Sequence, residues 1–169
     1  MAKYTLKYPP FSVMLLGIAI VVVLDQWTKH LASSLLVYAQ PVEVLPILDW
    51  TLLHNPGAAF SFLADAGGWQ RWFFTLVSSV VSVAFLVWMA RLKPEEWLVR
   101  YSLLFIIGGA LGNLIDRVTL GYVVDFIHFH WKSHYFPAFN VADMAISFGA
   151  ILIVLDMIIN SRSKKAVVS

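Results

Sequence analysis

Two aspartates with apolar neighbours are the residues of this sequence that could perform chemistry together. Asp125 lies in the stretch "YVVDFIHF", and Asp143 lies near the start of "FNVADMAISFGAILIVLDM". Two carboxylates brought close together cannot both ionise easily, so one of them keeps its proton. The ionised member of such a pair can take a proton from water, and the protonated member can polarise a carbonyl group. The residues alone leave two interpretations open: a catalytic pair, or two unrelated interfacial acids.

Other polar side chains stand four residues apart, the spacing that places them on one side of a helix. Asp25 and Lys29 have this spacing, which favours an ion pair. We interpret that pair as a structural one at a helix end. Asn113 and Arg117 have the same spacing; Arg117 can extend toward a membrane surface, whereas a buried Asn113 amide needs hydrogen-bond partners.

Two further asparagines occur at positions with a local structural role. Asn140 precedes Asp143 by three residues, and asparagine is a preferred residue type at a helix N-cap. Asn55 and Gly57 in "HNPGAAFSF" predict a tight turn, followed by small residues that allow close approach.

The composition predicts that these residues belong to a membrane protein. Hydrophobic residues make up 60% of the 169 residues and charged residues 13%, against about 25% charged residues in soluble domains. Crossing a membrane takes about 20 mostly apolar residues, and segments of about that length cover roughly 11–30, 72–90, 97–115 and 141–160. We therefore predict an all-α membrane protein with four transmembrane helices, forming a single domain over residues 1–169.

The positions of Lys and Arg predict how the chain is oriented, because these residues gather on the cytoplasmic side of membrane proteins. One predicted side carries Lys3, Lys7, Arg91, Lys93, Arg100, Arg162, Lys164 and Lys165. The other side carries Lys29, Arg71, Arg117 and Lys132. We expect both termini to be cytoplasmic, and the connections at about 31–71 and 116–140 to lie outside.

This orientation predicts the depth of the acids in the last span. Asp143 lies one turn or less below the outer interface. Asp156 follows 13 residues later, which is roughly 20 Å deeper and on nearly the opposite helical face. We interpret Asp156 as a residue of the cytoplasmic end, near Arg162.

The two outer connections show the patterns of β-strands. "VEVLPILDWTLLHN" has strand-like character, and Pro46 limits it to edge or broken strands. In "DFIHFHW" the residue types alternate with a period of two, which indicates an extended, half-buried segment. Aromatic residues, which favour the headgroup level, also cluster on this side. We predict a small β-rich extracytoplasmic platform on the outer membrane surface.

Several functional classes fit less well. A proton-coupled membrane carrier, the alternative function, would have acids at mid-membrane and often repeated halves. A membrane metalloprotease is a further alternative, suggested by His128, His130 and His134. Its "HExxH" motif is absent from the sequence, so we expect neither a metal nor a cofactor. The sequence contains no "GxSG", the motif expected of a serine intramembrane protease. It also contains no Cys, which excludes a thiol nucleophile. A net charge of +2 does not predict binding of nucleic acid.

Over nearly its whole length the chain resembles the lipoprotein signal peptidases, also called signal peptidase II. The resemblance lies in "DQWTK", "NPGAAFSF", "GGALGNLIDR", "VVDFI" and "FNVADMAI", in that family's order and at its spacing. It implies a bacterial aspartyl peptidase of the cytoplasmic (inner) membrane, with its active site near the outer face. Such enzymes cut the signal peptide from a prolipoprotein just before a cysteine that bears a diacylglyceryl group. Membrane lipids and peptide-like inhibitors of the globomycin type are the other implied partners.

The resemblance also implies roles for individual residues. Asp125 of "VVDFI" and Asp143 of "FNVAD" correspond to the catalytic pair, and Asp25 and Lys29 of "DQWTK" are carried over as structural. The residues that would support the substrate and the pair are Asn55, Asn113, Arg117 and Asn140. This sequence departs from the family pattern at Pro56 and at Met144, where other residues are common. Neither departure touches the catalytic pair; they bear only on what the resemblance implies about the local turn and the fit of the substrate.

Overall fold

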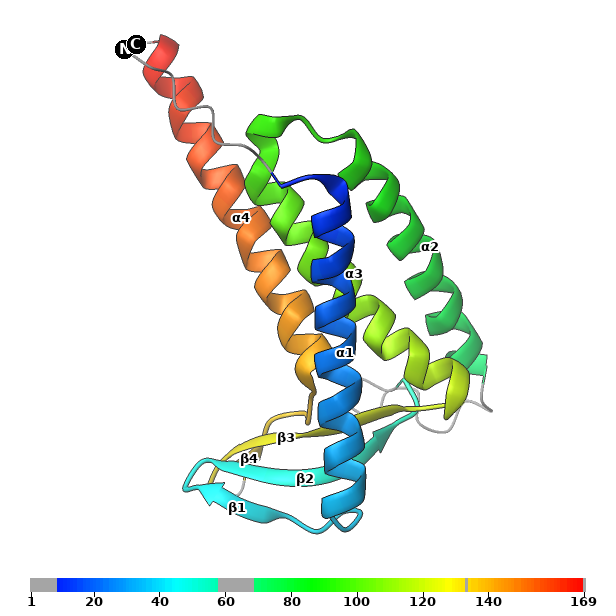
Figure 1. The fold of residues 1–169 in the computed structure, drawn as a ribbon. Coiled ribbons are helices and arrows are strands. Elements are labelled where there is room, and N and C mark those ends of the chain that lie inside the picture. The colour runs from blue at the N-terminus through cyan, green and yellow to red at the C-terminus, as the bar shows by residue number, and fades with distance from the viewer. Residues whose placement is uncertain (1–8, 58–68, 133, 169) are drawn as a thin grey trace.

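Four long helices and a small antiparallel sheet make up the structure, a computed structural model that describes residues 9–57, 69–132 and 134–168 (Figure 1). The helices are α1 (Phe11–Leu35), α2 (Trp69–Arg91), α3 (Trp97–Thr119) and α4 (Val141–Val168), and the short 3-10 helix η2 (Pro94–Glu96) leads into α3. Apolar stretches long enough to cross a membrane lie in Phe11–Leu35, Trp69–Arg91, Pro94–Thr119 and Val141–Ser161. The predicted fold class is confirmed.

The helices are longer than the apolar runs that predicted them. α1 continues past His30 to Leu35, and α2 begins at Trp69 rather than at residue 72. Hydropathy locates the part of a helix that suits hydrocarbon, whereas the backbone hydrogen bonds of a helix continue through polar residues until the chain turns. The helices therefore carry polar side chains beyond their most apolar segments.

Helix α3 lies at the centre of the bundle and packs against each of the other three helices. Half of its apolar stretch is buried, compared with 11% for the stretches of α2 and α4. The core includes Met14 and Ile18 of α1, Met89 of α2, and Leu103 and Ile107 of α3. The outward faces of the other helices stay apolar and exposed, as expected for surfaces that contact lipid.

The glycines of α3 allow its neighbours to come close, as small residues do between membrane helices. A Cβ atom at Gly108 would lie 2.7 Å from the Cβ of Val21 in α1. A Cβ atom at Gly109 would collide with the backbone carbonyl oxygen of Ala142, in the first turn of α4. One at Gly112 would lie 2.5 Å from a carboxylate oxygen of Asp25. These glycines therefore let α1 and α4 pack closely against α3.

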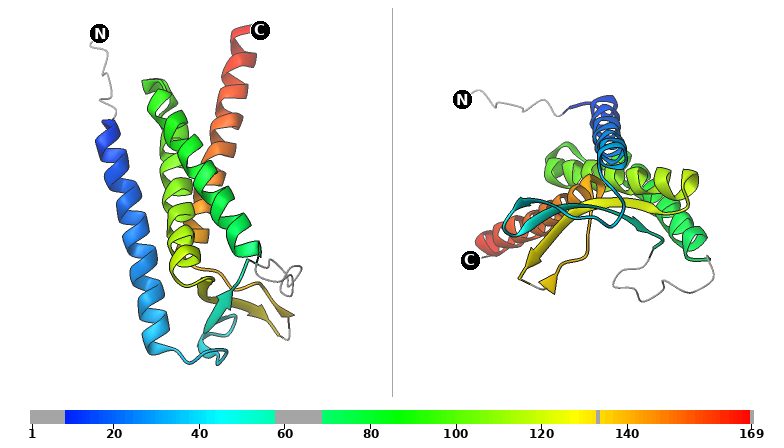
Figure 2. Two further views of the ribbon diagram at one scale, coloured as in Figure 1. Left: turned by 90° about the vertical axis from the view of Figure 1, so that its right-hand side faces the viewer. Right: turned by 90° about the horizontal axis from the view of Figure 1, so that it is seen from below.

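The sheet contains β1 (Val42–Leu45), β2 (Leu48–Asn55), β3 (Val123–Trp131) and β4 (His134–Tyr135), in the order β1-β2-β3-β4. All three strand pairs are antiparallel. Pro46 falls between β1 and β2, so the connection after α1 forms a broken strand pair as predicted. The sheet lies at the end of the bundle opposite the start of α1 and the end of α4 (Figures 1 and 2).

The connection from α3 to β3 passes through a turn that α2 supports. Arg71 donates from Nε to the carbonyl oxygen of Arg117 at 2.7 Å and from Nη2 to that of Val118 at 2.7 Å. Gly121 follows with φ +89°, a left-handed conformation that a side chain rarely adopts. The chain then enters β3, which carries Asp125. Lys3, Lys7 and residues 58–62 of "NPGAAFSF", which entered the sequence argument, lie outside the described residues.

The close contact at Gly109 leads to a stability prediction. Gly109→Ala should lower the free energy of unfolding by about 1–3 kcal/mol, because a backbone carbonyl cannot move aside without shifting α4. Thermal unfolding in detergent measures the change. Gly17→Ala is the matched control, because its new methyl group meets the flexible tip of Leu104. Equal losses of stability in the two variants would contradict the assigned packing.

Candidate active site

Asn140 joins the two aspartates singled out in the sequence. Its Nδ2 donates to Oδ1 of Asp125 at 2.7 Å, and its backbone N–H donates to Oδ2 of Asp143 at 3.2 Å. Its Oδ1 in turn accepts from the backbone N–H of Asp143 at 3.0 Å, which is the N-cap bond expected from its position. Asn140 is fully buried. One residue therefore caps the start of α4 and, through its side chain and its backbone N–H, bonds to a carboxylate of β3 and to a carboxylate of α4.

Each carboxylate also accepts a hydrogen bond from a second amide. Asn55, the last residue of β2, donates from Nδ2 to Oδ2 of Asp125 at 3.0 Å. Its Oδ1 accepts from the N–H of Gly57 at 2.9 Å, and this turn fixes which end of the amide faces Asp125. Asn113 of α3 donates from Nδ2 to Oδ1 of Asp143 at 2.8 Å. The site thus draws on β2, β3, α3 and α4.

A buried cation stands behind these amides. Lys29 of α1 forms ion pairs from Nζ with Asp25 at 2.8 Å and with Asp116 at 2.9 Å, and it donates to Oδ1 of Asn113 at 2.8 Å. Because the oxygen of Asn113 faces the lysine, its nitrogen faces Asp143. Asp25 also accepts from the N–H of Ala142 at 2.8 Å. The i,i+4 pair of the sequence therefore connects α1 to α3 and to the start of α4.

Burial and charge act together on Asp125, which is 3% exposed. Loss of solvation, together with the negative charge of Asp143, raises the pKa of Asp125 to about 7. The hydrogen bonds from Asn55 and Asn140 and the charge of Lys29 oppose this rise in pKa. A carboxyl group that holds its proton near neutral pH can donate a hydrogen bond, which an ordinary surface aspartate cannot.

Arg117 lies near both carboxylates, one helical turn beyond Asn113. Its Nη1 donates to the backbone carbonyl oxygen of Asn113 at 3.3 Å, and its guanidinium group lies 5.4 Å from the ring centroid of Phe74. The charges of Asp143 and Asp125 act on it electrostatically. Its buried Nε has no hydrogen-bond partner among the described residues. The guanidinium group therefore retains donor capacity beside the two aspartates.

The sequence argument assigned no role to two residues of this cluster. Asp116 is buried beside Lys29, and Gln26 donates from Nε2 to Oδ1 of Asp116 at 2.8 Å. Asp116 stands three residues after Asn113, so helical spacing was the signal that could have found it. Gln26 gave no such signal. Its neighbour Asp25 was already interpreted as part of a polar ion pair at the helix end, so a second polar residue there did not indicate a further contact.

Asp156 lies apart from the cluster, in the half of α4 far from the sheet. Its Oδ2 accepts from Nδ2 of Asn160 at 2.9 Å, within the same helix. The side chain of Arg162, with which the sequence argument associated it, is outside the described part of the chain. Asp156 therefore offers a carboxylate of the same protein without contacts to the two aspartates of the site.

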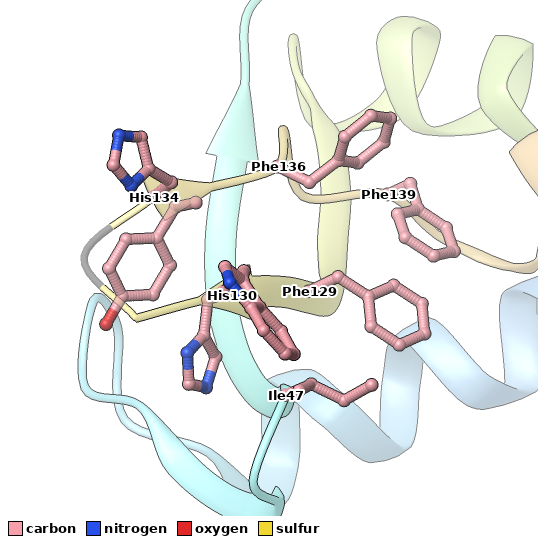
Figure 3. A pocket seen from close by; sticks show the side chains of 8 residues that line it. Ile47, Phe129, His130, His134, Phe136 and Phe139 are labelled. Carbon is pink, nitrogen blue, oxygen red and sulfur yellow. The ribbon is translucent and has the colours of Figure 1, made fainter.

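A cavity of about 730 Å³ lies beside β3 and β4, and the described residues that line it include no aspartate or glutamate (Figure 3). It is mostly apolar and is lined by Ile47, Phe129, His130, Trp131, His134, Tyr135, Phe136 and Phe139. Phe139 connects it to the site, because its backbone bonds to Ile127 of β3 in both directions, at 2.9 and 3.0 Å. His130 and His134 are the imidazole groups of this cavity, whereas Asp125 and Asp143 lie outside it.

The histidines of the platform take part in packing and pairing. His128 and His130 lie 4.8 and 5.2 Å from the ring centroid of Tyr135, and Nε2 of His130 lies 3.4 Å from Oδ1 of Asp49. Burial lowers the pKa of His128. In the described part of the chain, no three His, Cys, Asp or Glu side chains are grouped so that they could hold a metal ion.

Comparisons with known proteins identify the family. The sequence model of "Signal peptidase (SPase) II" matches residues 17–159. A lipoprotein signal peptidase of Acinetobacter baumannii is 55% identical over 155 residues, which is 91% of this chain and 88% of that protein. One from Pseudomonas putida is 50% identical over 150 residues, which is 88% of each chain.

Solved structures agree with this result. A bacterial membrane enzyme determined by the in meso method at 2.3 Å has a TM-score of 0.79 and 30% identity, covering 90% of this chain and 92% of that one. A second, determined at 1.9 Å, has a TM-score of 0.75 and 31% identity, covering 86% and 92%. The matched residues 17–159 include every member of the carboxylate cluster, so the chain belongs to the signal peptidase II family, the lipoprotein signal peptidases.

Proposed function

We propose that this chain is an aspartic endopeptidase that removes signal peptides from diacylglyceryl-modified prolipoproteins, cutting before the lipidated cysteine. Family membership supports the removal of signal peptides from lipoproteins. The observation that carries the aspartic mechanism is the pair of hydrogen bonds from Asn140 to Asp125 and Asp143. The side chain of one buried residue bonds to the first carboxylate and its backbone N–H bonds to the second, which supports action of both on a common water molecule.

In the proposed mechanism the two acids have different roles. Asp125, the more buried acid, holds the proton and donates a hydrogen bond to the carbonyl oxygen of the scissile peptide bond. Asp143, which is half-buried, is ionised and takes a proton from the attacking water. The water oxygen then bonds to the carbonyl carbon. The proton that Asp143 took from the water passes to the leaving amine as the C–N bond breaks. The amine becomes the N-terminus of the lipidated cysteine.

The supporting residues would hold this arrangement during the reaction. Asn55 and Asn113 keep the two carboxylates facing the same space through their amide hydrogen bonds. Arg117 supplies unused donors to a substrate carbonyl group beside the pair. Asp25 and Lys29 act structurally, by tying α1 to the residues that carry the site. An inhibitor of the globomycin type would compete with the substrate for this space.

The position of the cluster suits a substrate anchored in lipid. Asp143 lies in the first turn of α4, at the end of the bundle that carries the sheet (Figure 1). We place both termini in the cytoplasm and the sheet on the outer face, where a lipid-modified cysteine meets the interface. Acids near a membrane surface remain accessible to water, which hydrolysis consumes. A carrier would instead have its acids near mid-membrane.

Loss of either carboxylate tests the mechanism. Asp125→Asn and Asp143→Asn should each lower processing of a lipid-modified preprolipoprotein by at least about 100-fold, since a positioned acid or base contributes 10²–10⁴-fold. Gel mobility of precursor and product measures cleavage by the purified, membrane-inserted variants. Asp156→Asn is the matched control and should keep most activity. Near-normal processing by either of the first two variants would remove that acid from the mechanism.

The raised pKa of Asp125 predicts the pH dependence. Because the proposed mechanism needs Asp125 protonated, kcat/KM should fall as the pH rises through about 7. The rate of cleavage measured between pH 5 and 9 would show this limb. A rate that keeps rising above pH 8 would contradict the proton-donating role of Asp125.

The same proton should affect stability. Between pH 3.8 and about 7 the folded protein binds more protons at Asp125 than the unfolded chain does, so its stability falls as the pH rises through that window. Asp125→Asn lacks this group and should lose less stability over the same range. The free energy of unfolding is measured for both proteins at pH 5 and at pH 8. An equal change between the two pH values in both proteins would contradict the assigned protonation.

A further inference from the structure

Asp116 is a buried carboxylate to which the mechanism above gives no role. It is 2% exposed, yet it lies at the outer end of α3, where solvent is close. Three donors converge on it: Nε2 of Gln26 at 2.8 Å, Nζ of Lys29 at 2.9 Å and the backbone N–H of Val124 at 3.0 Å. Two of them belong to α1 and one to β3, so this single side chain connects three elements.

The bond to Val124 holds the backbone next to Asp125. The carbonyl oxygen of Val124 accepts from Nδ2 of Asn140 at 3.2 Å, the same amide nitrogen that donates to Asp125. The N–H and the C=O of Val124 are thus both held by side chains. The pairing of β2 with β3 changes register between Trp50 and Leu53, and Leu53 is the residue opposite Asp125. Side-chain anchors therefore hold β3 next to the point where its ladder becomes irregular.

Asp116 also balances charge around the site. Lys29 lies between Asp25 and Asp116, and its positive charge acts on Asp125 against the effect of Asp143. Removing the negative charge of Asp116 would leave the charge of Lys29 less compensated. The field at Asp125 would then favour its ionised form more strongly.

We infer that Asp116 is a positioning residue of this peptidase: its carboxylate fixes the strand immediately before Asp125 and holds Lys29 against Asn113. This inference rests on the proposed function, because it assigns the role through Asp125 and Asp143. Asp116 does not contact the substrate. It acts through the N–H of Val124 and through the orientation of the Asn113 amide, which places a donor on Asp143.

Two substitutions separate the two actions of Asp116. Asp116→Ala removes the acceptor for Val124, and a shift of β3 by about 1 Å should lower kcat by about 10- to 100-fold with a smaller change in KM. Asp116→Asn keeps an acceptor oxygen and removes only the charge, so its kcat should lie clearly closer to that of the unchanged protein. Its pH–rate profile should move to lower pH, because Asp125 would lose its proton more easily.

Both variants have a structural reason to fold. A cavity of about 240 Å³ borders Asp116, and Gln26, Lys29 and Val124 also line it. Water entering this space can replace the lost oxygens of Asp116→Ala, and Lys29 keeps its pairing with Asp25. Hydrogen exchange of the Val124 amide gives a readout that does not depend on activity: it should be faster in Asp116→Ala than in Asp116→Asn.

The control removes a buried charge elsewhere in the outer layer. Asp49 is 5% exposed, and its recorded ion pair is with His130 of the platform, so Asp49→Asn should leave both kcat and the pH profile unchanged. The inference is overturned if Asp116→Ala cleaves within twofold of the unchanged protein while Asp125→Asn is inactive. It is also overturned if Asp116→Asn is as slow as Asp116→Ala with an unshifted profile. Activity of Asp125→Asn itself would instead refute the proposed mechanism.

Discussion

The site depends on one buried cation. Lys29 is 3% exposed, and its ammonium group is held by Asp25, Asp116 and the oxygen of Asn113. A charge in such surroundings is tolerated only when it is paired and its hydrogen bonds are made. Because those partners belong to α1 and α3, and Asp25 also bonds to the start of α4, satisfying the lysine fixes how three helix ends meet. Loss of one partner would leave a buried charge poorly compensated.

The amides convert this ionic cluster into a specific arrangement of the two aspartates. An asparagine side chain has a donor end and an acceptor end, so a partner at one end determines which group faces the other way. Lys29 sets Asn113, the N–H of Gly57 sets Asn55, and the N–H of Asp143 sets Asn140. In each case the nitrogen faces a carboxylate. The orientation of the donors therefore follows from contacts outside the pair.

The helices and the sheet serve the site in different ways. Glycines on α3 let the backbone of α4 approach closely enough for the N–H of Ala142 to reach Asp25. The sheet brings Asp125 back over the helix ends from a connection that would otherwise lie in solvent. The cavity of Figure 3 lies on its aromatic surface, and the described residues that line this cavity include no carboxylate. The two aspartates thus lie where the apolar bundle meets the sheet.

Local patterns of the sequence predicted most of the fold. Short segments have their own preferences for a type of structure and of surroundings, and these can be predicted without knowledge of long-range contacts. Examples are the four apolar runs, the period-two pattern before Trp131 and the break at Pro46. The same is true of the N-cap at Asn140 and of the i,i+4 pair of Asp25 and Lys29. The limits of the helices were less accurate, because hydropathy does not mark where helical hydrogen bonding ends.

The sequence by itself determined which groups could do chemistry: two aspartates in apolar stretches, with amides and an ion pair near the same membrane surface. Only the tertiary structure decided that Asn140 would hold both aspartates, that Asp116 would anchor the strand before Asp125, and that Arg117 would keep donor capacity beside them. Those contacts join residues as far apart as Asp25 and Ala142, separated by 117 positions. Such distances are set by the packing of whole helices. The free energy of that packing depends on contacts between segments, so no single segment of the sequence predicts it.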